Sequence, residues 1–126
     1  MTLRLHRDVD GASLAPEGSV VAIGAFDGLH LGHQAILAEV RRRAADRGLA
    51  SAVITFEPLP RAYFSKEPVP RLSGVREKAE GMGAAGIREL LSLRFDQALT
   101  EMSAEDFVHR VIVKRLAARE VWVGED

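Results

Sequence analysis

The 126-residue chain contains no cysteine, and this absence excludes several kinds of chemistry. Without thiols there are no disulfides, no thiolate nucleophile and no cysteine-rich metal site. The formal net charge is only −1, so no general electrostatic attraction favours nucleic acid or an anionic membrane, and an anionic substrate needs a local positive site. Apolar runs fall short of the ~20 residues that span a bilayer. The first segment, MTLRLHRDVD, has no signal-peptide pattern, and we expect a cytoplasmic protein.

What the sequence does contain is an alternation of short apolar runs and amphipathic segments, on a chain long enough for one domain with a real core. The predicted strands are Ser19–Phe26, Ala50–Phe56, Ile87–Leu93 and Glu120–Val123, and helices are predicted over 33–47, from near Ser73, and over 103–118. An additional edge strand, LRLH, is predicted within Met1–Gly18. This order predicts an α/β fold: a Rossmann-like, doubly wound parallel sheet with helices on both faces.

A proline-rich segment separates the second strand from the second helix. Pro58, Pro60, Pro68 and Pro70 exclude regular structure there. A connection of about 15 residues is longer than usual, and such loops often carry function. The segment is therefore a candidate part of a binding site.

The stretch GAFDGLHLGHQ joins the first strand to the first helix and predicts a phosphate site. Gly24 and Gly28 allow a sharp turn and a close approach of the backbone to a ligand. Gly32 lies at the mouth of the helix, where free N–H groups and the helix dipole attract anions. His30 and His33 are three residues apart, so both imidazoles can donate to phosphate oxygens as charge grows there during attack at phosphorus.

Other interpretations of this stretch are weaker. It is not a P-loop, because no GK[ST] follows, and it does not have the G-x-G-x-x-G spacing of dinucleotide sites. A zinc site needs a third ligand, and the remaining histidines, His6 and His109, have no predicted relation to the pair. The alternative without function is a glycine-rich turn whose histidines only cap the helix.

The same stretch resembles the G-x-F-D-G-x-H-x-G-H signature of the nucleotidylyl transferases. It is most similar to the amino-terminal FMN adenylyltransferase (FAD synthetase) module of prokaryotic bifunctional riboflavin kinase/FAD synthetases. Four segments carry this resemblance over most of Ser19–Asp126: SVVAIGAFDGLHLGHQAIL, VITFEPLPRAYF, RLSGVREKAEGM and VKRLAAREVWVGED.

The resemblance implies that the AMP part of ATP is transferred to FMN, giving FAD and pyrophosphate, with Mg²⁺ assisting ATP. It implies that His30 and His33 hold the ATP phosphates and stabilise the transition state. Residues implied at the nucleotide are Gly24, Phe26, Asp27, Gly28, Gly32 and Asp126, and residues implied at the flavin are Phe56, Pro58, Pro60 and Phe64. The phosphate of FMN can attack the α-phosphorus directly, so catalysis is positioning plus charge stabilisation.

This sequence departs from the family pattern in two ways. Leu59 stands where many members have histidine between the two prolines of FEPLP. The family's later F-x-F-G stretch, its serine- and threonine-rich second nucleotide motif and its β-barrel riboflavin kinase module are not in this sequence. We therefore expect residues 1–126, with their core at 19–126, to form an incomplete FMN adenylyltransferase domain without kinase activity, in a parent that carries both activities.

Two alternative functions stay open at this point. Another nucleotidylyl transferase with this signature would use pantetheine phosphate, nicotinamide mononucleotide or glycerol phosphate as the acceptor. A second class is a non-catalytic nucleotide-binding module, because fold alone does not give function. The oligomeric state is not predicted by any feature of the sequence.

Overall fold

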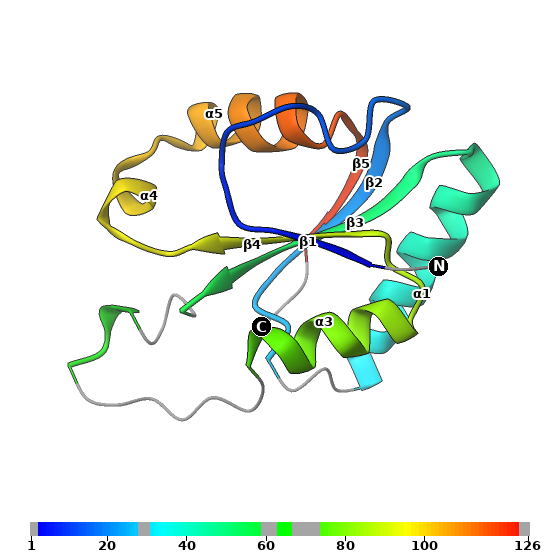
Figure 1. The fold of residues 1–126 in the computed structure, drawn as a ribbon, viewed down its shortest axis with the longest axis horizontal. Coiled ribbons are helices and arrows are strands. Elements are labelled where there is room, and N and C mark those ends of the chain that lie inside the picture. The colour runs from blue at the N-terminus through cyan, green and yellow to red at the C-terminus, as the bar shows by residue number, and fades with distance from the viewer. Residues whose placement is uncertain (1–2, 28–30, 59–62, 67–73, 124–126) are drawn as a thin grey trace.

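The computed structural model describes residues 3–27, 31–58, 63–66 and 74–123. Its centre is a five-stranded sheet in which every neighbouring pair of strands is parallel (Figure 1). The strands, in chain order, are β1 Arg4–His6, β2 Ser19–Ile23, β3 Ala50–Glu57, β4 Glu89–Arg94 and β5 Ala118–Val123. The predicted edge strand near the amino terminus is confirmed as β1, which pairs with β4.

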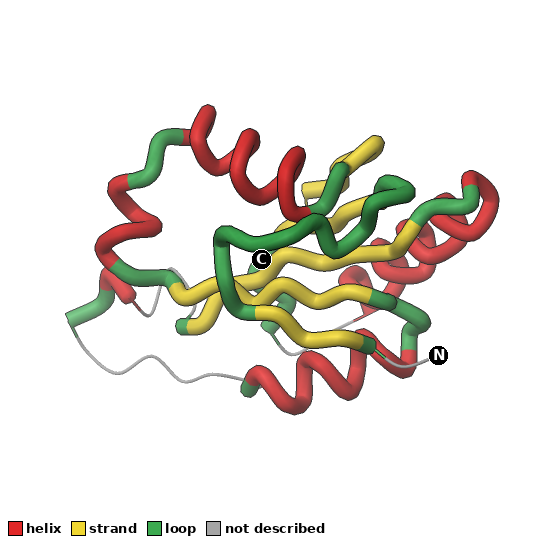
Figure 2. Tube along the Cα trace, turned by 45° about the horizontal axis from the view of Figure 1, so that its top comes forward, coloured by secondary structure: helices red, strands yellow, loops and turns green. Residues whose placement is uncertain are grey.

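Helices cover both faces of this sheet, as predicted (Figures 1 and 2). The helices are α1 Leu31–Arg47 and α3 Val75–Ala84 on one face, and α4 Gln97–Glu101, α5 Ala104–Phe107 and η1 Val108–Arg115 on the other. On the first face, Leu37 and Met82 pack with Val53 of β3. On the second face, Val111 and Leu116 pack with sheet residues. Two apolar layers therefore hold the sheet from both sides.

The order of strands across the sheet is β1-β4-β3-β2-β5. From β2 the chain first builds toward β3 and β4, and then crosses back to place β5 on the other side of β2. The strand order therefore reverses at β2. In open α/β sheets, ligands bind at the carboxyl ends of strands at such a reversal, so the fold places the GAFDG turn at the expected binding position.

The end of the first predicted strand and the winding of the last predicted helix differ from the structure. The strand predicted to extend to Phe26 ends at Ile23, because Phe26 has φ +52°, a left-handed conformation that a strand cannot contain. The helix predicted over 103–118 changes its winding: after α5 it widens into η1, where the Leu116 N–H donates to the Val111 carbonyl five residues earlier, at 3.1 Å. The start of α5 is capped locally, since the Ser103 hydroxyl accepts from the Asp106 N–H at 3.0 Å.

The short helix α4 was not predicted, because five residues are too few to show a helical period. Its start is nevertheless encoded locally. The Asp96 carboxylate accepts from the N–H of Leu99 at 3.0 Å and caps the helix. Asp96 can be recognised in the sequence as a helix cap only when the end of the preceding strand is also known.

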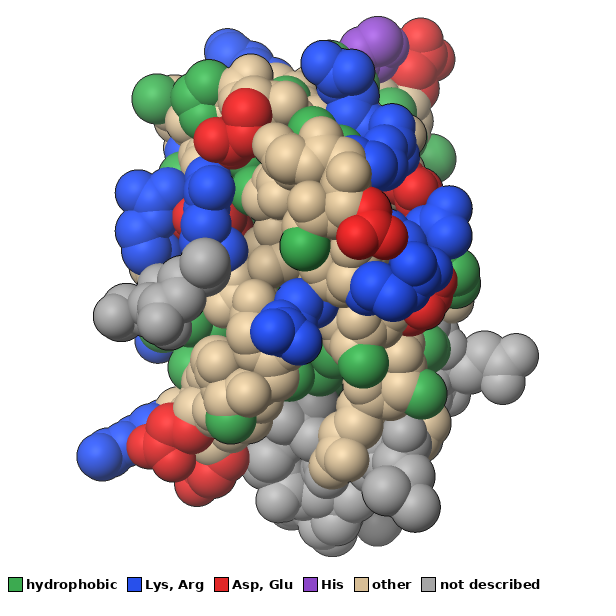
Figure 3. Space-filling view, turned by 90° about the vertical axis from the view of Figure 1, so that its right-hand side faces the viewer, with side chains coloured by type: hydrophobic (Ala, Val, Ile, Leu, Met, Phe, Trp, Pro, Cys, Tyr) green, Lys and Arg blue, Asp and Glu red, His purple; other side chains and the backbone are tan. Residues whose placement is uncertain are grey.

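The outer surface of α1 carries several arginines, and most of their charge is balanced. Arg42 forms ion pairs with Glu39 and Asp46, and Arg43 lies 3.5 Å from Glu39, four residues earlier in the helix. Arg43 also pairs with Glu120 of β5. Figure 3 shows basic and acidic side chains interspersed on one face of the molecule. This face therefore gives no single-sign field that would attract a polyanion.

Candidate nucleotide site at the carboxyl edge of the sheet

The turn that follows β2 is held by its backbone. The N–H of Gly24 donates to the Ile54 carbonyl at 3.1 Å, which continues the β2–β3 pairing by one residue. The chain then turns sharply at Phe26, whose ring is 1% exposed. A non-glycine residue at positive φ is uncommon and is often found where function needs a particular backbone geometry. Burial of the Phe26 ring helps to hold this conformation.

His33 is the third residue of α1, and the structure places its ring inside the molecule. The residue is 1% exposed and its imidazole meets the Phe26 ring edge to face, with 5.1 Å between centroids. The sequence predicts that His33 donates to phosphate at the start of the helix, and the structure shows its ring packed against Phe26 there. His30 lies outside the described residues, so the role predicted for the pair stays a prediction.

The remaining predicted nucleotide residues divide into two groups. Asp27 is 9% exposed at the end of the turn, and Gly32 is exposed in the first turn of α1. Gly32 is the second residue of the 17-residue helix α1, and Asp27 precedes this helix in the chain. The amino end of a helix favours an anion through its dipole and its N–H groups. Gly28 and Asp126 fall outside the described residues.

A buried lysine lies under this turn, and sequence reasoning missed it. Lys78 of α3 is 1% exposed, and its Nζ donates to the Ala25 carbonyl at 2.7 Å. The same carbonyl accepts from the Thr55 hydroxyl at 2.9 Å. The available signal was a lysine four residues before the buried Met82, on the face of the helix that should be apolar.

A recess lies at the same edge of the sheet, where β3 and β4 end. It is a cleft of ≈ 1130 Å³ lined by the ends of β3 and β4, by the segment after β1 and by α4, and its wall includes Pro58, Tyr63 and Phe95. Four rings gather at this place. Phe95 meets Phe56 at 5.7 Å, Tyr63 at 5.4 Å and Phe64 at 5.8 Å between ring centroids, in each case edge to face. A flat aromatic ligand suits such a wall.

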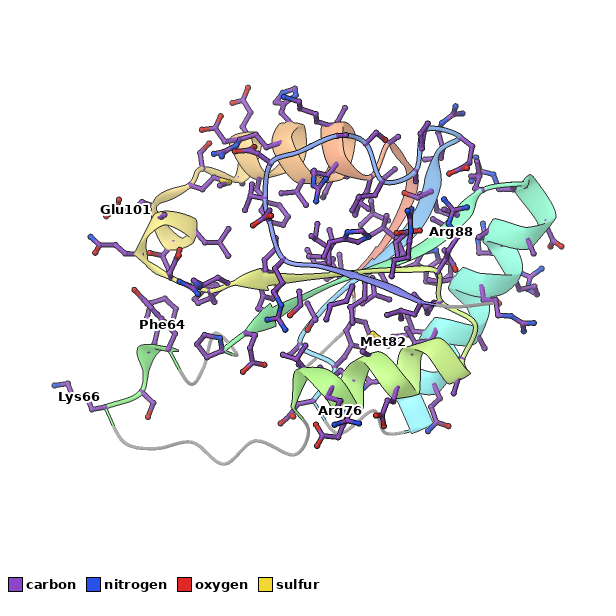
Figure 4. The ribbon with its side chains drawn as sticks, viewed as in Figure 1. Phe64, Lys66, Arg76, Met82, Arg88 and Glu101 are labelled. Atoms are coloured by element: carbon purple, nitrogen blue, oxygen red, sulfur yellow. The ribbon has the colours of Figure 1, made fainter. Side chains whose placement is uncertain are left out.

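The structure thus brings together three of the four predicted flavin residues. Phe56, Pro58 and Phe64 all lie at this cleft or its aromatic cluster, while Pro60 is outside the described residues. Phe64 is 68% exposed and extends from the segment that follows β3 toward α4 (Figure 4). Phe95 was missed; the signal was an aromatic residue two positions after a predicted strand, at the edge where ligands bind.

The described parts of the chain contain no group of three histidine or acidic residues that could hold a metal ion. His6 bonds instead to Glu89, with 2.9 Å between Nε2 and Oε1, and His109 is exposed on η1. Neither histidine therefore joins His33 as a third zinc ligand.

A Rossmann-like parallel sheet with a glycine-rich turn at its reversal defines an α/β domain of the nucleotidylyl transferase type. The family model described as FAD synthetase matches residues 12–126. The chain belongs to the FAD synthetase family, and the resemblance carried by its motifs is confirmed.

Curated relatives agree with this family. The chain is 43% identical over 116 residues to a bifunctional riboflavin kinase/FMN adenylyltransferase of Pseudomonas fluorescens, covering 90% of this chain and 37% of the relative. It is 36% identical over 126 residues to the Escherichia coli K12 protein of the same name, covering 98% of this chain and 40% of the relative. The chain thus spans about two fifths of the length of these relatives.

A solved structure supports the fold independently. The whole chain matches 42% of a chain titled as a macrolide-efflux protein of Streptococcus pneumoniae, with a TM-score of 0.78 and 25% sequence identity. Within the described residues, no helix has the length and apolar character required to cross a membrane.

Proposed function

We propose that the protein carrying this chain transfers AMP from ATP to FMN, releasing pyrophosphate and forming FAD. The observation that carries this proposal is that the carboxyl edge of one sheet holds both a glycine-rich turn at the strand reversal and an aromatic cleft at the ends of β3 and β4. The names of the curated relatives favour FMN over pantetheine phosphate, nicotinamide mononucleotide or glycerol phosphate as the acceptor.

ATP is assigned to the turn and the start of α1. Phosphate oxygens accept hydrogen bonds from backbone N–H groups at the amino end of α1, where the helix dipole favours negative charge. His30 and His33 are the proposed donors to the oxygens on which negative charge increases during the transfer. Because His33 is packed against Phe26, its imidazole has little freedom to rotate, and a preorganised donor loses little entropy when the substrate binds.

FMN is assigned to the aromatic cleft. Its flat ring would lie against the cluster formed by Phe56, Tyr63, Phe64 and Phe95, which offers ring edges and faces to a planar ligand. Its phosphate would then reach back along the sheet edge to the ATP. There a phosphate oxygen attacks the α-phosphorus, a new phosphorus–oxygen bond forms, and the bond to pyrophosphate breaks.

Mg²⁺ would enter with ATP as part of the substrate. Mg²⁺ commonly uses one or two carboxylates together with substrate phosphates and water, so it needs no dedicated cage of acidic residues. Asp27 is the carboxylate that the described turn offers at the helix entrance. We assign no further metal ligand, and we assign a cytoplasmic location because both substrates are soluble nucleotides.

The test is an acceptor panel with the intact protein that carries this chain. ATP and Mg²⁺ are supplied with FMN, pantetheine phosphate, nicotinamide mononucleotide or glycerol phosphate, and both pyrophosphate and the adenylylated product are measured. FAD formation from FMN alone supports the proposal. Transfer to another acceptor but not to FMN overturns the flavin assignment, and nucleotide binding without transfer to any acceptor supports the non-catalytic alternative.

A further inference from the structure

Lys78 is buried at a position where an apolar residue would be expected. It is 1% exposed on α3, four residues before Met82, which is fully buried. Figure 4 shows Met82 directed from α3 toward the sheet, and Arg76 directed away from it. Removing an ammonium group from water is costly, and lysine is almost never fully buried unless it is paired. A charge kept at this position therefore needs an explanation beyond packing.

Two of the contacts of Lys78 lie at one backbone carbonyl. Its Nζ lies 2.7 Å from the oxygen of Ala25 and 3.4 Å from the hydroxyl of Thr55, which itself donates to that oxygen at 2.9 Å. Ala25 lies between the end of β2 and Phe26, in the middle of the GAFDG turn. One charged donor and one neutral donor thus hold a single peptide group of the candidate nucleotide site from below.

We propose that Lys78 is a positioning residue, which orients the Ala25–Phe26 peptide so that the Phe26 N–H is presented to an anionic group of the nucleotide. This inference deepens the proposed function and rests on it. A trans peptide is planar, and its C=O and N–H point in opposite directions. Since the Ala25 carbonyl points toward β3 and α3, the N–H of Phe26 points away from them. Across the described residues, no acceptor for this N–H is found.

The charge matters because the turn is strained. Phe26 has φ +52°, a conformation with a cost that the surroundings must offset. A hydrogen bond from a charged donor in a buried setting is about twice as strong as a neutral one, so Lys78 holds the peptide more firmly than Thr55 alone. The same turn carries the Phe26 ring that packs on His33. Lys78 therefore also acts on His33 through Phe26.

The test separates this role from simple packing. Lys78→Met keeps the side chain's length and apolar stem but removes the charged donor. The control is Lys114→Met, the same substitution at an exposed lysine of η1. In the intact protein, three quantities are measured: affinity for a non-hydrolysable ATP analogue, kcat and KM for FAD formation, and the thermal unfolding midpoint.

For Lys78→Met we expect at least tenfold weaker binding of the analogue and a kcat about 10²-fold lower, as a displacement of about 1 Å can produce, with KM for FMN unchanged. The unfolding midpoint should stay near that of the wild type, because an apolar side chain of similar volume suits the surrounding core. Lys114→Met should match the wild type in all three measurements. Unchanged analogue binding in folded Lys78→Met overturns the proposal.

Thr55→Val serves as a second variant if Lys78→Met does not fold. It removes the neutral donor to Ala25 and keeps the shape of the side chain, so we expect weaker analogue binding by a smaller factor. Wild-type analogue affinity in Thr55→Val would then overturn the proposal. Because analogue binding does not require FMN, a wild-type protein that binds ATP but makes no FAD refutes the proposed function while Lys78 remains testable.

Discussion

Each end of the sheet contains a buried charged residue, but the partners of these two residues differ. At the amino end of β4, the fully buried Glu89 carboxylate is surrounded by Arg4, Arg88 and His6 at 2.9 to 3.0 Å. At the carboxyl end, the buried Lys78 ammonium bonds to a backbone carbonyl of the candidate site.

The two buried charges therefore have different roles: Glu89 stabilises the fold, and Lys78 positions the backbone of the candidate site. The Glu89 network joins β1, β4 and the residue before β4, and its charges balance because Arg88 also pairs with Glu17. Burial opposes ionisation of Glu89, but the hydrogen bonds from Arg4, Arg88 and His6 together hold its pKa below the usual value. The Lys78 contacts fix backbone geometry next to a cleft. A change at the amino end should therefore reduce stability, and a change at the carboxyl end should reduce activity.

The largest effect should come from His33 at the carboxyl end. For His33→Ala we expect a decrease in kcat for FAD formation of about 10² to 10³-fold, the usual loss when one preorganised donor is removed. The matched control is His6→Ala at the amino end, which should leave kcat unchanged and lower the unfolding midpoint. Turnover that falls equally in both variants would show that the two ends are not functionally distinct.

Glu89→Gln should disrupt only the ion-pair network at the amino end of β4. We expect it to lower the free energy of unfolding by about 2 to 3 kcal/mol, less than for a fully buried pair because the half-exposed Arg4 can rehydrate. Affinity for ATP should not change. Chemical denaturation and nucleotide titration of the same preparation check both expectations, and altered ATP affinity would contradict the separation of the two ends.

The pH dependence of stability gives a further test of the role of Glu89. Because the folded-state pKa of Glu89 lies below its ordinary value of 4.5, its stabilising contribution is complete above that value and is lost as the pH falls through the lowered pKa. The wild type should therefore lose stability below about pH 4.5, and Glu89→Gln should lose less over the same interval. Unfolding curves recorded from pH 7 to pH 3 would show this difference; parallel curves would contradict it.

At the carboxyl end, Phe95→Leu should show that the aromatic cleft binds FMN and not ATP. Loss of the ring contacts with Phe56, Tyr63 and Phe64 should raise KM for FMN about tenfold, while KM for ATP stays constant. Phe107→Leu is the matched control, because this phenylalanine is the last residue of α5 and packs against the apolar core on that face of the sheet. Steady-state kinetics with each substrate varied in turn decide the outcome, and a rise in KM for ATP alone would place FMN elsewhere.

The smallest effect is expected on the surface. Arg43 pairs with Glu120 and stacks 5.4 Å from the Trp122 ring, joining α1 to β5, whereas Arg42 pairs only within α1. Arg43→Met should lower the unfolding midpoint slightly, by less than Glu89→Gln, and Arg42→Met should change it less still. Neither variant should alter turnover. Equal midpoints for the two arginine variants would show that the link to β5 adds nothing measurable.

The sequence by itself determined the class of fold and the location of the site. Period and composition are local properties, so the β-branched runs, the helical spacing of apolar residues and the glycines of GAFDG were enough to predict a doubly wound sheet with a phosphate site after β2. The Ser103 cap was equally local, since the hydroxyl and its N–H partner are three residues apart.

Only the tertiary structure decided which distant residues meet there. Lys78 reaches Ala25 across 53 residues of sequence, and Phe95 joins Phe56 from the neighbouring strand. The positive φ of Phe26 and the burial of His33 also depend on packing, because each conformation is stable only when the opposing side chain fills the space. A sequence pattern shows only which residues are neighbours along the chain, whereas the contacts that position this site join residues from different strands and helices.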